Sequence, residues 1–299
     1  MVMCDFRSLR YKLPPEAFAC GPKNEPEPSD LIDEETWQEL IWLPDDVSLR
    51  TSDHHGTLLR KARQLTGHWI EMVLDIQSLI PNPRDDALAL ACLNVYDDLQ
   101  ASIYTMLTGF YRQSIATLRI ALEETLTGAY FRAYPNPTRF QQWADGLQEG
   151  QLWVGEIRKK LSKIEPYSFF ESGKYKLLCG KDSWAGFLYG FLSKFVHGCS
   201  YYTDEDGNRV PTSNVGLWGG SNGPVYEERS VKLWSVIFFE TALFCLMLVG
   251  LAEKRLLDLE KPAGVGFKDF LKRAISWHRG IAPLHPVACD IVRILEDSY

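Results

Sequence analysis

Four polar residues in two widely separated segments have types and spacings that could act on an anionic substrate. Arg119 and Glu123 lie four residues apart, so on a helix their side chains are neighbours and can pair. Ser193 and His197 have the same spacing in the second segment. An imidazole can act as a general acid or base, and a guanidinium can stabilise charge that develops on a phosphate oxygen. Arg119, Glu123, Ser193 and His197 are therefore the candidate catalytic residues.

The segment that carries the first pair is expected to form a helix over residues 112–134. At about 100° per residue its apolar side chains fall on one stripe, which consists of Ile115, Leu118, Leu122, Leu126 and Ala129. Along one shoulder of that stripe lie Arg112, Arg119, Glu123 and Tyr130. A charged pair beside an apolar stripe is expected to be at least half-buried.

The segment that carries the second pair is expected to form a helix over residues 184–197. One of its faces holds four residues with little or no side chain, followed by a histidine at the end of the helix. These residues are Ser183, Gly186, Gly190, Ser193 and His197. Such a face lets another helix approach closely. Two hypotheses stay open for the cluster. Either the four candidate residues form a satisfied polar network that fixes the register of the two helices, or His197 does acid–base chemistry while Arg119 stabilises an anion.

The elements around these two segments predict an all-α fold, an antiparallel helical bundle. Helical periodicity and caps place helices at residues 31–43, 52–80, 85–109, 112–134, 137–147, 152–164, 184–197, 226–259, 267–277 and 286–296. The connection at 109–112 is so short that the helices it joins must be antiparallel neighbours. A Gly-rich loop is inserted around 199–224, where Asp206-Gly207 could turn a small β-hairpin.

The chain divides into an arm and one domain. Residues 1–28 are rich in proline and lack periodicity, which predicts an extended N-terminal arm. Residues 29–299 are interpreted as a single helical domain with its bundle core at about 85–260.

Composition limits the partners. The net charge of −7 gives no general attraction to a phosphate backbone, so DNA is not an expected partner, and RNA would need a local site. The seven cysteines are scattered and form no CxxC pair, which predicts a reducing, cytoplasmic setting without disulfides or zinc. No metal or cofactor motif is present, so neither is expected.

Residues 233–252 are apolar for long enough to span a bilayer. One hypothesis is a membrane anchor. The favoured one is a central helix that is apolar on all sides because other helices surround it. Glu240 in the middle of the segment would cost about 2–3 kcal/mol in lipid, which favours the central helix.

Two short runs carry a family resemblance. The run 109–123 ends in Arg119 and Glu123, and the run 192–198 holds Ser193, His197 and Gly198. An "RxxxE" helix followed by an "SxxxH" helix resembles uncharacterised bacterial helical proteins and is similar to the HEPN superfamily, over about residues 85–260. The resemblance implies a helical protein that acts through partners, as a homo-oligomer or with an operon-encoded protein, in bacterial stress or phage defence.

The same resemblance implies an alternative, a metal-independent RNase that uses His197 and Arg119. Nucleases of that superfamily carry an arginine a few residues before the histidine on the same helix. Here Phe191, Leu192 and Ser193 stand at those positions, and Lys194 is the only cation nearby. Nuclease activity therefore requires Arg119 to supply the guanidinium from another helix.

Overall fold

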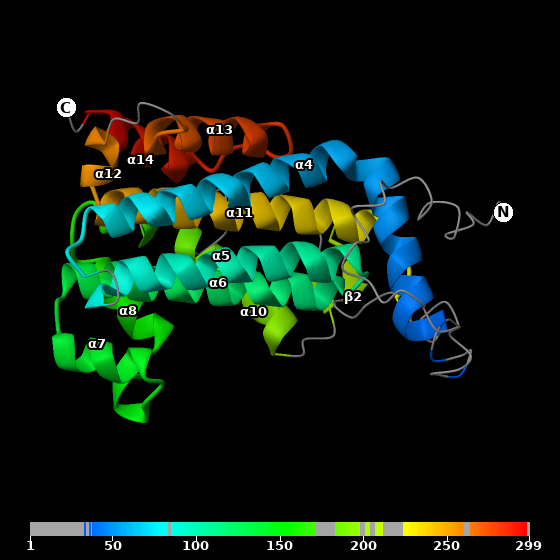
Figure 1. Ribbon diagram of the computed structural model, residues 1–299, viewed down its shortest axis with the longest axis horizontal. Coiled ribbons are helices and arrows are strands. Elements are labelled where there is room, and N and C mark those ends of the chain that lie inside the picture. Colours follow the sequence, from blue (N-terminus) through cyan, green and yellow to red (C-terminus); the bar gives the residue numbers. More distant parts are fainter. Residues whose placement is uncertain are drawn as a thin grey trace, which may run out of the picture.

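Helices that pack against one another build the molecule in the computed structural model, which is all-α, as predicted (Figure 1). The structure describes residues 33, 36, 38–82, 85–171, 183–197, 201–203, 207–211, 224–259 and 264–297. The predicted arm, residues 1–28, and most of the 199–224 loop lie outside these ranges.

Seven longer helices carry most of the part of the chain that the structure describes: α4 (Leu43–Ser78), α5 (Ala87–Leu107), α6 (Tyr111–Ala133), α10 (Trp184–Val196), α11 (Glu228–Ala252), α13 (Phe267–Arg279) and α14 (Pro286–Asp297). Shorter elements connect them: a π-helical turn at Gln38–Trp42, α7 (Pro137–Ala144), α8 (Val154–Leu161), α12 (Arg255–Asp258), and 3₁₀ turns at Gln148–Gly150 and Tyr167–Glu171. In Figure 1, α4, α11, α5 and α6 lie lengthwise, with α13 and α14 along one side and α8 and α10 along the other.

The α5–α6 pair is an antiparallel hairpin, as the short connection predicted. Ser102 on α5 bonds the carbonyl of Ser114, near the start of α6, and Asn94 bonds Glu124 further along both helices. Asp86 caps the start of α5 by accepting from the backbone N–H of Ala89. Gly109 follows the end of α5 with φ of +82°, which confirms it as the C′ residue.

Helix α11 is the central element. It packs against α4, α5, α6, α13 and α14, which confirms the prediction that neighbours surround residues 233–252. Within the described part of the chain it is the one helix long and apolar enough to cross a membrane, and 83% of its apolar window is buried in the fold. Burial against other helices explains why it is apolar all round.

Two predicted helix boundaries are wrong. The helix predicted over 52–80 begins earlier, at Leu43, because Pro44 lies in its first turn, where a proline costs no hydrogen bond. A break remains at His55, whose φ of −127° and ψ of 22° are not helical, and the first turns of α4 bend away there (Figure 1). The helix predicted over 226–259 stops at Ala252, since Glu253 leaves the helical conformation with φ of −131°.

The predicted hairpin is present. Strands β1 (Tyr201–Thr203) and β2 (Arg209–Pro211) pair antiparallel with Tyr202 opposite Val210. Gly207, which precedes β2, has a φ of +80°, a value that glycine adopts without strain. The hydrophobic core extends from Val47 to Leu295, beyond both ends of the range 85–260.

Candidate functional site

Arg119 and His197 meet where α6 and α10 pack against each other. Nη1 of Arg119 lies 2.7 Å from Nε2 of His197. Arg119 projects from the middle of α6, and His197 is the residue that ends α10. This contact brings together the two residues on which both hypotheses for the cluster depend.

Besides His197, two side chains hold Arg119 in place. Its Nε donates to Oε1 of Glu123 at 2.7 Å, one turn along α6. Its Nη2 donates to the hydroxyl of Tyr189 on α10 at 2.7 Å, and its guanidinium carbon lies 4.8 Å from the centre of the Tyr189 ring. The Arg119 side chain is only 12% exposed, whereas His197 is exposed and open to a ligand.

The contact defines the state of the imidazole. An arginine side chain can only donate hydrogen bonds, so Nε2 of His197 must accept. The imidazole is then neutral, with its proton on Nδ1. A neutral imidazole with a lone pair on Nε2 is the form that can take a proton from a substrate.

Arg112 fixes the end of α10. Its Nε donates to the carbonyl of Phe195 at 2.9 Å, two residues before His197. The backbone N–H of His197 bonds the carbonyl of Ser193 at 3.0 Å, which closes the last turn. Phe195 is buried in the core, so the position of His197 is set by the packing of α10.

Ser193 does not join the other three candidate residues. Its hydroxyl donates to the backbone carbonyl of Tyr189 at 2.7 Å, one turn back on its own helix. This local bond competes with a role across the helix interface. The structure therefore brings together Arg119, Glu123 and His197 and leaves Ser193 with a structural bond.

Tyr189 belongs to the site although the sequence did not single it out. It contacts Arg119 through both its hydroxyl and its ring, and the guanidinium of Arg158 on α8 lies 5.9 Å from the same ring. Arg158 is itself paired with Glu171. The only sequence signal is that Tyr189 precedes His197 by about two helical turns.

A second polar group lies between α5 and α6. Burial, followed by the charges of Glu124 and Asp97, raises the pKa of Asp98 to about 7. Burial also raises the pKa of Glu124, although a bond from Asn94 opposes this effect. One carboxyl oxygen of Asp98 is buried without a hydrogen-bond partner within the described residues.

The described residues contain no group of three or more His, Cys, Asp or Glu side chains that could hold a metal ion. The Arg119–Glu123–His197 group has one imidazole and one carboxylate, and the carboxylate faces the guanidinium. Its chemistry is that of an anion site with a neutral base.

No protein-family model, curated protein or solved structure matches the chain. Its function therefore has to be inferred from the site itself.

Proposed function

We propose that the protein is a HEPN-like, metal-independent RNase that acts through Arg119 and His197. The observation that carries this proposal is the 2.7 Å contact between Nη1 of Arg119 and Nε2 of His197, two groups from different helices, of which His197 is exposed. In this proposal Arg119 takes the part of the arginine that HEPN nucleases carry on the histidine helix.

Arg119 and Tyr189 bind the phosphate. Three of the five N–H groups of Arg119 are used in bonds to Glu123, Tyr189 and His197, which leaves two for a ligand among the described residues. The Tyr189 hydroxyl accepts from Arg119, so its own proton is available for a phosphate oxygen. Glu123 is a positioning residue, because its carboxylate orients the guanidinium.

His197 is the base. When a phosphate oxygen takes over the N–H of Arg119 Nη1, the lone pair on Nε2 of His197 becomes free. Nε2 then removes the proton of the ribose 2′-hydroxyl, and the 2′-oxygen forms a bond to phosphorus. The bond from phosphorus to the 5′-oxygen breaks, and that oxygen takes a proton from water. The products are a 2′,3′-cyclic phosphate and a 5′-hydroxyl end.

The test is cleavage of tRNA or total RNA in EDTA. Wild type is expected to cleave, and His197→Ala is expected to lose about 10²–10⁴-fold in rate, the usual contribution of a general base. His54→Ala is the matched control, since His54 is also exposed but lies on α4. Cleavage at wild-type rate by His197→Ala, with unchanged circular dichroism, contradicts the proposal.

A second candidate is a helical protein that acts through partners in a bacterial stress or phage-defence system. It is favoured by apolar side chains on α10: Phe187 is 43% and Val196 44% exposed, and no described residue comes within 4 Å of a Cβ added at Gly190. A homo-oligomer or an operon-encoded protein would cover this surface. In light scattering, Phe187→Lys is expected to lower the assembly mass while His197→Ala leaves it unchanged. If the assembly mass is unchanged in both variants, the protein does not form a homo-oligomer through this surface.

A further inference from the structure

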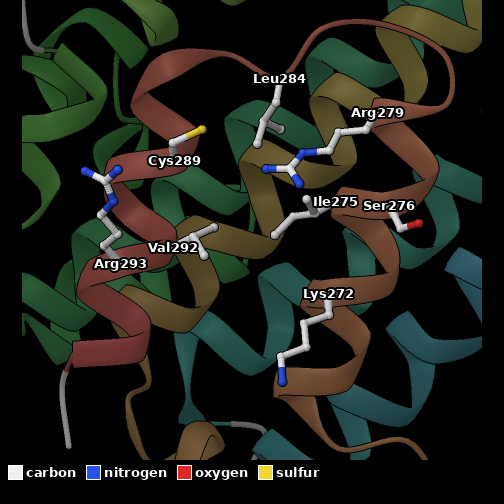
Figure 2. Close-up of a pocket in the computed structure, with 8 residues that line it drawn as sticks. All are labelled: Lys272, Ile275, Ser276, Arg279, Leu284, Cys289, Val292 and Arg293. Atoms are coloured by element: carbon white, nitrogen blue, oxygen red, sulfur yellow. The ribbon is translucent and has the colours of Figure 1, made fainter.

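Helices α13 and α14 enclose a hollow that is separate from the candidate site. Its volume is about 530 Å³, within the range of small-molecule sites, about 300–1,000 Å³. Neither helix contributes a residue to the Arg119–His197 group. Figure 2 shows the hollow between the two helices, with Leu284 of the connecting loop at one end.

The lining of the hollow combines aliphatic side chains with cationic ones. Ile275 from α13, Val292 from α14 and Leu284 supply aliphatic surface, and Ile275 is 9% exposed. The side chain of Arg279 extends from α13 across the space between the helices, so that its guanidinium lies between Leu284 and Ile275 (Figure 2). Lys272 adds a second cation at the other end of the hollow.

Arg279 has no ion-pair partner among the residues that the structure describes. This sets it apart from Arg119, Arg132, Arg158 and Arg255, each of which is paired with a carboxylate. Arg293 also borders the hollow, but it points away from it and lies 3.8 Å from Asp290. An exposed, unpaired guanidinium over an aliphatic surface is suited to a ligand with an anionic head and an apolar body.

We infer that this hollow binds a single-chain anionic amphiphile, with its head group on Arg279 and its alkyl chain against Ile275, Leu284 and Val292. Carboxylate and phosphate heads each present two oxygens that can accept parallel hydrogen bonds from one guanidinium. The alkyl chain supplies affinity, because each buried methylene contributes about 0.8 kcal/mol. A neutral chain of the same length lacks the head-group contact and binds more weakly.

Cys289 provides a direct readout. Its thiol points into the hollow from α14 in Figure 2, and its side chain is partly accessible. Cys92 and Cys245 are buried in the core. A ligand in the hollow therefore protects Cys289 from alkylation, which peptide mass spectrometry measures at that residue alone.

The experiment measures the rate of iodoacetamide alkylation of Cys289 in the full chain. The ligands compared are decanoate, decyl phosphate, decanol and acetate. At ten times the Kd of decanoate about nine-tenths of the sites are filled, so alkylation is expected to slow about tenfold. Decyl phosphate is expected to protect as well if any anionic head suffices, and protection by decanoate alone restricts the ligand to carboxylates.

Arg279→Gln is expected to remove the protection by decanoate. The matched control is Arg273→Gln, an exposed arginine of α13 that does not line the hollow and whose loss should leave the protection intact. Equal alkylation with and without decanoate overturns the inference. So does equal protection by decanol, or protection that survives in Arg279→Gln. Each variant is compared with itself, with and without ligand, so its own basal reactivity cancels.

Discussion

Replacing Glu240 should destabilise the protein strongly, because its carboxylate is the acceptor for two buried donors. Oε1 accepts from the indole N–H of Trp184 at 2.6 Å, and Oε2 accepts from Nε2 of His278. The His278 side chain is fully buried, and that of Glu240 is 15% exposed. These bonds join α11 to α10 and α13. They also satisfy the Glu240 carboxylate inside the protein, whereas its burial in lipid would be costly.

The expected loss of unfolding free energy follows from the number of hydrogen-bond donors that are left without an acceptor. Glu240→Ala leaves both the indole and the imidazole N–H unsatisfied, at about 1–3 kcal/mol each, so it should cost about 2–6 kcal/mol. Glu240→Gln retains one acceptor. Its amide can bond Nε2 only if the proton of His278 moves to Nδ1, which is buried without a partner among the described residues. One orphaned donor remains, and the cost should be about 1–3 kcal/mol.

Urea unfolding followed by circular dichroism measures both values, with an unchanged slope as the sign that unfolding stays two-state. Glu228→Ala on the same helix is the matched control. Its pair with Lys232 is exposed at 59% and 67%, so its loss should leave the midpoint nearly unchanged. A midpoint for Glu240→Ala equal to that of Glu228→Ala would refute the reasoning.

Two further predictions concern the close packing of α5 against α6 and the dependence of stability on pH. Gly128→Ala should cost about 1–3 kcal/mol in urea unfolding, because its Cβ would lie 2.8 Å from that of Ala91 on the facing helix. Gly155→Ala, whose Cβ would have no described residue within 4 Å, should stabilise by up to about 1 kcal/mol, and equal effects of the two substitutions would contradict this packing. The pKa of Asp98 is raised to about 7 by burial and by Glu124 and Asp97, so the folded state holds a proton that the unfolded state has lost between about pH 4 and 7. Wild-type stability should therefore fall as pH rises through that window, and Asp98→Asn should be the more stable protein at pH 8, with the difference vanishing towards pH 4; a difference independent of pH would contradict the shift.

Local signals made much of the fold predictable. The Asp86 cap and Gly109 mark the two ends of α5, and the Ser183 hydroxyl caps α10 by accepting from Gly186. The start of α4 was not predictable in this way. In the sequence Pro44 indicates the end of a helix. In the structure it lies in the first turn of α4, which burial of Val47 holds in place.

The candidate site was predictable only in part. Spacing on one helix gave the Arg119–Glu123 pair, and the small face of α10 indicated where His197 could meet it. Tyr189 was missed because its contact depends on how α10 is rotated against α6, which a sequence pattern does not specify. Ser193 has the right spacing, but its hydroxyl bonds the turn before it.

The partners of Glu240 show the same limit. The sequence indicates that a charge in the middle of α11 is costly. Trp184 and His278 satisfy it from 56 and 38 residues away along the chain, and only the tertiary arrangement brings them together.

The most direct test of the Arg119–His197 site is the chemistry of the ends it would produce. A short RNA is incubated in EDTA with wild type, Arg119→Ala and His197→Ala, and mass spectrometry identifies the new termini. The proposed function predicts 2′,3′-cyclic phosphate and 5′-hydroxyl ends with wild type alone, and none from the same sequence with 2′-deoxyribose throughout. Cleavage of the 2′-deoxy strand, or the same cyclic ends at equal rate with His197→Ala, would contradict it.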